Sequence, residues 1–315
     1  MYILAWSSNS LRMVAPRPTP RGTALAMSSA SSSAAILLLT FDCTGTLFEP
    51  TESAGALYKQ ALVGEATRLK LGVEAAQAVQ ESILDAAFAR AYKAQTIAAP
   101  CFGAGLCSSQ QWWERVVEQT FTETVPSDLL SQLLPGTFQE LYSHVFIGER
   151  GWRVRAGVKK MLTECSRWKR AAADAGAPTP VVGVISNWDE RLSTLLQELH
   201  LYGHFDFVLT SREAGVEKPD GRIFEAARDM AHTPHGARAV HVGDSFFTDV
   251  EGAFGAGFEA VFVAPRSTLE TLKEEEPKRL ARSPHMHCED IFTLNEQLGL
   301  DPQLDSFYRT NIVQC

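Results

Sequence analysis

One carboxylate stands directly after an apolar run near residue 40. Residues 36–41 are Ile-Leu-Leu-Leu-Thr-Phe, and Asp42, Cys43 and Thr44 follow. The run predicts a buried strand, and open α/β sheets bind ligands at the carboxyl ends of their strands. A carboxylate there can act as a nucleophile, because a covalent intermediate divides one difficult displacement into two easier ones. The alternative is a solvated acid in a strand-to-loop turn.

Two later segments offer groups that suit a phosphoryl group. A second strand pattern, residues 181–185, ends in Ser186 and Asn187, whose hydroxyl and amide donate hydrogen bonds without adding charge. Lys218 lies beside the rigid Pro219 and could balance the negative charge of a nucleophile and a phosphoryl group. The alternative for Lys218 is a surface position in a turn before the next helix.

Two further acids follow a third strand pattern, residues 239–243. Asp244 comes directly after this strand, and Asp249 follows five residues later. Together with Asp42 they would form a pocket of oxygen ligands, which suits Mg²⁺. The alternative is that one of these acids caps the next helix.

In this order, the four segments resemble the motifs of the haloacid dehalogenase superfamily, over roughly residues 36–298. Residues 181–265 and Gln111-Trp112-Trp113 resemble one branch of it in particular. The joint set is specific, although no single segment is.

The resemblance implies a role for each residue. Asp42 would be the nucleophile, and Ser186 and Lys218 would hold the phosphoryl group, with Asn187 beside them. Mg²⁺ would be bound by Asp42, Asp244 and the main-chain carbonyl of Thr44. Asp249 would support the metal or orient Lys218.

The sequence departs from the superfamily pattern at Thr44. Most phosphatases of the superfamily have a second Asp there, which acts as general acid and base. A threonine hydroxyl does not titrate near neutral pH, and general acid–base catalysis contributes roughly 10²–10⁴-fold. We therefore expect a slow Mg²⁺-dependent hydrolase of phosphate esters or acyl phosphates that works through an aspartyl-phosphate.

Two other functions are compatible with parts of the pattern. A non-catalytic protein could keep the fold and bind a phosphorylated ligand or a protein partner. Dehalogenases of the superfamily also lack the second Asp and need no metal. However, they lack the Gly243-Asp244 pair found here, which favours metal-dependent phosphate chemistry.

The alternation of strand and helix patterns predicts an α/β fold, with a doubly wound parallel sheet and an inserted helical cap. We assign residues 35–50 and 151–298 to the core and 51–150 to the cap. Residues 1–34 form a disordered or targeting leader, and 299–315 a polar tail. We interpret His285, His287 and Cys288 as a polar loop rather than a metal site.

Composition limits the partners and the compartment. The 315 residues carry a net charge of −8 without a basic stripe, so we expect a small phosphorylated substrate and no nucleic acid.

The sequence contains no run of 18 apolar residues, so we predict no membrane span. The six cysteines lack C-x-x-C spacing, as in intracellular proteins with reduced thiols. We favour the cytoplasm; the acid-free, Arg- and Ser-rich N-terminus makes mitochondrial import the alternative. The sequence predicts no oligomeric state.

Overall fold

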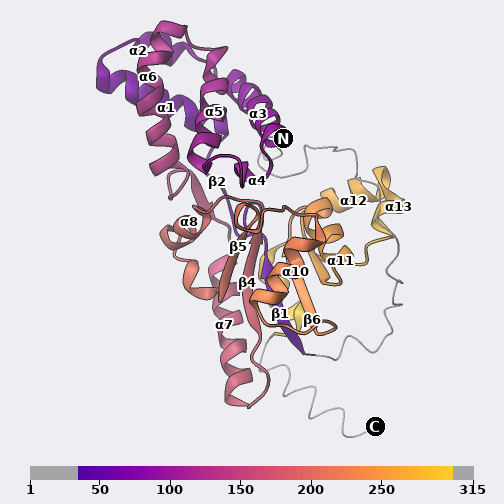
Figure 1. The fold of residues 1–315 in the computed structure, drawn as a ribbon. Helices are drawn as coiled ribbons and strands as arrows, with labels where there is room; N and C mark the ends of the chain where they lie inside the picture. Colours follow the sequence, from indigo (N-terminus) through magenta and orange to yellow (C-terminus); the bar gives the residue numbers. More distant parts are fainter. Residues whose placement is uncertain (1–34, 301–315) are drawn as a thin grey trace, which may run out of the picture.

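The computed structural model describes residues 35–300. Six parallel strands form one sheet, in the order β5-β4-β1-β6-β7-β8 (Figure 1). These strands are β1 (Ile36–Phe41), β4 (Val181–Ser186), β5 (Phe207–Thr210), β6 (Arg238–Gly243), β7 (Glu259–Val263) and β8 (Met286–Cys288). The chain adds β4 and β5 on one side of β1, then β6, β7 and β8 on the other. The carboxyl end of β1 is therefore the switch point at which such sheets bind ligands.

Apolar residues on both faces of the sheet explain the helices that cover it. Leu39 and Phe41 of β1 belong to one buried cluster, and Leu38 belongs to another. Helices α7 (Val158–Asp174), α8 (Leu192–Glu198) and α14 (Leu294–Leu298) contribute to the first cluster; α10 (Gly221–Met230) and α11 (Gly252–Gly255) contribute to the second. The predicted α/β fold with a doubly wound parallel sheet is confirmed.

An all-helical insert follows β1 and extends from one end of the sheet (Figure 1). Its helices are α1 (Ala54–Leu69), α2 (Val73–Ala78), α3 (Glu81–Ala98), α4 (Pro100–Gly103), α5 (Ser109–Thr122) and α6 (Ser127–Glu140), followed by a π-helical turn (Leu141–Val145). Helix α5 begins at a capping box of Ser108 and Gln111. A short antiparallel ribbon of β2 (Phe48–Pro50) and β3 (Trp152–Val154) joins the insert to the sheet.

The prediction of a polar loop near residue 287 is wrong. The segment that we interpreted as a polar loop is strand β8, in which Cys288 is buried and His287 Nε2 lies 2.8 Å from the carbonyl oxygen of Ala264. Three residues are too few for a periodic pattern to reveal a strand. The charged segment before it forms α12 (Arg266–Glu275) and α13 (Pro277–Leu280), which contain no buried residue.

Several sequence-based expectations concern the ends of the chain and its thiols. The leader and residues 301–315 of the tail lie outside the described residues. Within the described part, Leu300 is buried, and no helix is both long and apolar enough to span a membrane. The five cysteines between residues 35 and 300 are free thiols.

Candidate active site

Asp42 lies at the carboxyl end of β1, the switch point of the sheet. Its backbone N–H donates to the carbonyl of Val242 in β6, so the ladder between the strands continues to this residue. The chain then turns at Gly45, whose φ of +84° is accessible to glycine at little cost. A Cβ there would lie 2.2 Å from Asp244 Oδ2, so only glycine lets the loop pass this close to the second acid.

Lys218 and Ser186 hold one oxygen of the predicted nucleophile. Ser186 Oγ donates to Asp42 Oδ1 over 2.9 Å, and Lys218 Nζ contacts the same oxygen at 2.7 Å. Lys218 is 3% exposed, so its alternative as a surface residue is wrong. Among the described residues, no donor binds Asp42 Oδ2, which leaves this oxygen available for attack.

The side chain of Asn187 holds the backbone of Lys218. Its Nδ2 donates to the Lys218 carbonyl at 3.0 Å, and its Oδ1 accepts from the Lys218 N–H at 2.8 Å. This pair of bonds fastens the β4 end to the loop that carries the lysine. Asn187 also lines the cleft, so the structure places it beside the predicted phosphoryl site.

Asp249 is tied into the core by several donors. Its Oδ1 accepts from Lys218 Nζ at 2.7 Å and lies 3.4 Å from His241 Nε2, while its Oδ2 accepts from the backbone N–H of Ser245 at 2.9 Å. The next turn is capped by Ser245, whose Oγ accepts from the Thr248 N–H. The alternative that Asp244 or Asp249 serves as this cap is therefore wrong.

Asp42, Asp244 and Asp249, which we call the acidic cluster, carry more charge than the protein around them balances. Each offers a carboxylate oxygen within 4.8 Å of the others'. Lys218 pairs with Asp42 and Asp249, and the ion-pair geometry among residues 35–300 gives Asp244 no cationic partner. His241 supplies no compensating charge, because burial lowers its pKa to about 4.

The pKa values show this imbalance. Burial, together with the neighbouring carboxylates, raises the pKa of Asp42 and raises that of Asp244 further. For Asp249 burial acts in the same direction, but the Lys218 ammonium and the hydrogen bonds from Lys218 and His241 together outweigh it and lower the pKa. Lys218 is also buried, but Asp249 and Asp42 raise its pKa above the ordinary value. Lys218 thus compensates the charged form of Asp42 only in part, and the charged form of Asp244 has no ion-pair partner among residues 35–300.

This donor set fits a divalent cation. All three groups present carboxylate oxygen, the ligand that hard cations prefer, and a cation among them would relieve the excess charge. We identify the acidic cluster as a candidate divalent-metal site.

Aromatic side chains from the insert close over the acidic cluster. One cleft is lined both by core residues such as Asp42 and by Tyr92, Phe102 and Trp113. Trp113 is one of the two tryptophans that we singled out from the sequence. Trp112 is instead packed inside the insert, where its Nε1 donates to the carbonyl of Ala99.

Trp188 is a cleft residue that sequence reasoning missed. It follows Asn187 directly, and its indole Nε1 donates to Thr44 Oγ1 over 2.8 Å. The position after Ser186-Asn187 was the only available signal, and it does not reveal which way a tryptophan turns. Thr44 thus lies in the cleft with its side-chain oxygen already bonded.

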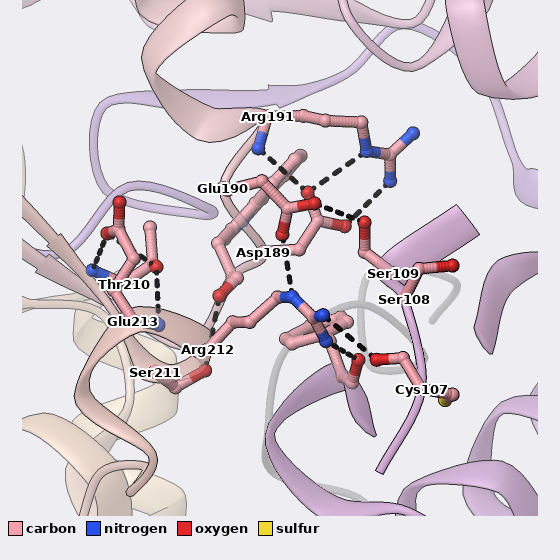
Figure 2. Close-up of polar contacts among 12 residues, drawn as sticks. Cys107, Ser108, Ser109, Asp189, Glu190, Arg191, Thr210, Ser211, Arg212 and Glu213 are labelled. Carbon is pink, nitrogen blue, oxygen red and sulfur yellow. Dashed lines mark hydrogen bonds and ion pairs between the residues drawn. The ribbon is translucent and has the colours of Figure 1, made fainter. Parts of the chain in front are cut away.

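The residues after Trp188 fasten the insert to the core. Asp189 is fully buried; its carboxylate accepts from Arg191 Nε, at 3.0 Å, and Nη2, at 2.7 Å, and from Trp113 Nε1, at 2.6 Å. We call Asp189, Arg191 and Trp113 the Asp189 clamp. Figure 2 shows a second connection, in which Arg212 pairs with Glu190 and donates to the carbonyl of Cys107.

The comparisons with known proteins agree with the fold and the motifs. Residues 36–257 match the model of the haloacid dehalogenase-like hydrolases. "Haloacid dehalogenase-like hydrolase domain-containing protein 3" of Homo sapiens is 36% identical over 248 residues, which cover 77% of this chain and 88% of that protein. This relative represents the branch that residues 181–265 resembled.

Two solved structures share the fold at low sequence identity. A 2-haloacid dehalogenase from Pseudomonas syringae superposes with a TM-score of 0.54 at 22% identity, covering 84% of this chain and 99% of that one. The hydrolase YfnB from Bacillus subtilis, solved bound to magnesium, gives 0.53 at 13% identity with the same coverage. From the family match, the relative and the motifs together, we conclude that this chain belongs to the haloacid dehalogenase-like hydrolases.

Proposed function

We propose that the protein is a Mg²⁺-dependent hydrolase that transfers phosphoryl groups from phosphate esters or acyl phosphates to Asp42. One observation carries this proposal. The predicted nucleophile has one oxygen held by Ser186 and Lys218 and a second oxygen to which no donor within residues 35–300 binds, at the edge of a charge-rich cleft. Binding alone would not require a carboxylate held in this way.

The chemistry follows from these positions. An oxygen of Asp42 attacks phosphorus while the bond from phosphorus to the leaving oxygen breaks. The leaving oxygen takes the electron pair of that bond and a proton from water. A second water then attacks the phosphorus of the aspartyl-phosphate, which releases phosphate and restores the carboxylate. Lys218 and Ser186 would balance charge and hold an oxygen of the transferring group.

The acidic cluster would hold the Mg²⁺ ion, together with the main-chain carbonyl of Thr44. Bound there, Mg²⁺ would neutralise charge on the phosphoryl group and favour the ionised form of Asp42. YfnB, which shares the fold and was solved with magnesium, supports this choice of metal.

The threonine at position 44 is the reason why we expect slow hydrolysis, and it also favours a second candidate function. It stands where most phosphatases of the superfamily have an acid, and its hydroxyl cannot replace the general acid–base step. A protein that only binds a phosphorylated ligand or a protein partner would show the same substitution. Such a protein would not form an aspartyl-phosphate.

The test is hydrolysis of 4-nitrophenyl phosphate and acetyl phosphate by the full chain, with Mg²⁺ and with EDTA. Asp42→Asn should reduce turnover at least about 10³-fold, the scale seen when a nucleophile is removed. Asp220→Asn is the matched control, because this acid caps α10 outside the cleft and should leave turnover unchanged. Turnover that survives in Asp42→Asn would overturn the proposal.

A further inference from the structure

The hydrogen bond between Trp188 and Thr44 has a defined direction. An indole N–H can only donate, so the Thr44 oxygen must be the acceptor in the 2.8 Å contact. A threonine hydroxyl also carries one hydrogen of its own. Among the described residues, no protein acceptor takes this hydrogen, and Thr44 lines the cleft together with Asp42. The hydroxyl is therefore held with its hydrogen free for whatever occupies the cleft.

The orientation of Trp188 is itself fixed by its surroundings. Its ring packs edge-on against Phe48, with 5.9 Å between centroids, and lies 5.3 Å from the ring of Trp152. Its backbone N–H donates to the carbonyl of Ser186 at 2.9 Å. The next residue is the fully buried Asp189 of the clamp. Trp188 can thus hold the Thr44 oxygen without first being ordered by a ligand.

We propose that Trp188 is a positioning residue that turns the Thr44 hydroxyl toward the leaving-group oxygen, to which Thr44 donates a neutral hydrogen bond. This inference rests on the proposed function, because it assigns a role within the same phosphoryl transfer. Thr44 lies two residues after the nucleophile and in the same cleft.

The fate of the electrons and protons when the leaving group departs explains why such a donor would favour some substrates over others. When the phosphorus–oxygen bond breaks, the leaving oxygen keeps the electron pair, Thr44 keeps its proton, and water protonates the product. A neutral donor stabilises part of the developing charge but does not remove it by proton transfer. The site should therefore favour substrates with acidic leaving groups, such as aryl and acyl phosphates. The hydrogen bond should matter more as the leaving group becomes less acidic.

Trp188→Phe tests this role, because it removes the indole N–H and keeps an aromatic ring. We expect turnover of phenyl phosphate to fall about 2- to 10-fold, the size of one neutral hydrogen bond, and that of 4-nitrophenyl phosphate to fall less. Trp113→Phe is the matched control: it removes the N–H of another cleft tryptophan, which donates to Asp189 instead. It should change both rates by the same factor. Equal losses on both substrates in Trp188→Phe would overturn the proposal.

A double-mutant cycle and a spectroscopic readout complete the test. In a Thr44→Val background, Trp188→Phe should add no further selective loss, because the hydroxyl is already absent. The indole N–H proton resonance of Trp188, assigned from its loss in Trp188→Phe, should shift upfield in Thr44→Val, while that of Trp113 stays in place. An unshifted resonance would show that the contact does not exist. If the wild type hydrolyses neither substrate, the proposed function fails and this role fails with it, whereas the resonance still reports on the contact.

Discussion

The Asp189 clamp and the acidic cluster are two groups of charges that differ in how completely they are compensated. In the Asp189 clamp, burial would raise the pKa of Asp189, but the Arg191 guanidinium and the donors from Trp113 and the backbone lower it. In the acidic cluster, burial and neighbouring carboxylates raise the pKa of Asp42 and Asp244. The clamp therefore acts as a structural fastening, whereas the acidic cluster has the charge pattern of a site that receives a cation.

Removing one acid from each group should have different effects on stability. Asp189→Ala leaves the Arg191 guanidinium without its carboxylate, and we expect the free energy of unfolding to fall by about 3–5 kcal/mol. Asp244→Ala is the matched change in the acidic cluster and should leave stability unchanged or raise it, since it removes uncompensated charge. Urea denaturation in EDTA measures both. A large loss in Asp244→Ala would contradict the difference that we draw between the groups.

The stabilisation of the folded protein by Mg²⁺, which we assign to the acidic cluster, should be the next largest effect. A ligand that binds only the folded protein stabilises it by about 2.7 kcal/mol at 100 times its dissociation constant. We expect Mg²⁺ to raise the melting temperature of the wild type but not that of Asp244→Ala. Arg222→Ala, which breaks an exposed pair with Asp220, serves as a control that should respond like the wild type. If Mg²⁺ raised the melting temperature of Asp244→Ala equally, the metal site would have to be assigned outside the acidic cluster.

The change of the free energy of unfolding with pH should be the smallest of the three effects, and its direction follows from the pKa values. Without metal, Asp42 and Asp244 have raised pKa values in the folded state, so the folded protein binds more protons than the unfolded chain. Stability from these groups is fully present below their unfolded pKa near 4 and is lost as pH rises through the folded values. The contribution of Asp189 to stability changes with pH in the opposite direction. Because its pKa is lowered in the folded state, this contribution is present above the unfolded pKa and is lost as the pH falls through the folded pKa.

The measurement is urea denaturation in EDTA between pH 4 and 8, comparing the wild type with Asp244→Ala. The wild type should lose more free energy of unfolding than the variant as the pH rises. Parallel curves would show that Asp244 titrates normally in the folded protein.

The sequence predicted Asp42 and Asp244 of the acidic cluster, and Ser186 beside them, because strand ends carry these residues. Asp42, Ser186 and Asp244 each end or follow an apolar strand, and parallel strands bring their carboxyl ends to one edge. The clamp was not predictable in this way. Trp113 and Asp189 are 76 positions apart, and their contact depends on how the insert packs on the core. The same holds for the indole of Trp188 and the hydroxyl of Thr44, 144 positions apart.

The most direct test of the central claim is to identify the residue that carries the phosphoryl group. The full chain would be incubated with acetyl phosphate and Mg²⁺, quenched in acid, reduced with borohydride and mapped by peptide mass spectrometry. We predict that an aspartyl-phosphate forms at Asp42, so that this residue is recovered as homoserine, and that neither EDTA-treated protein nor Asp42→Asn yields it. Modification at another residue, or turnover without any modification of Asp42, would contradict the account.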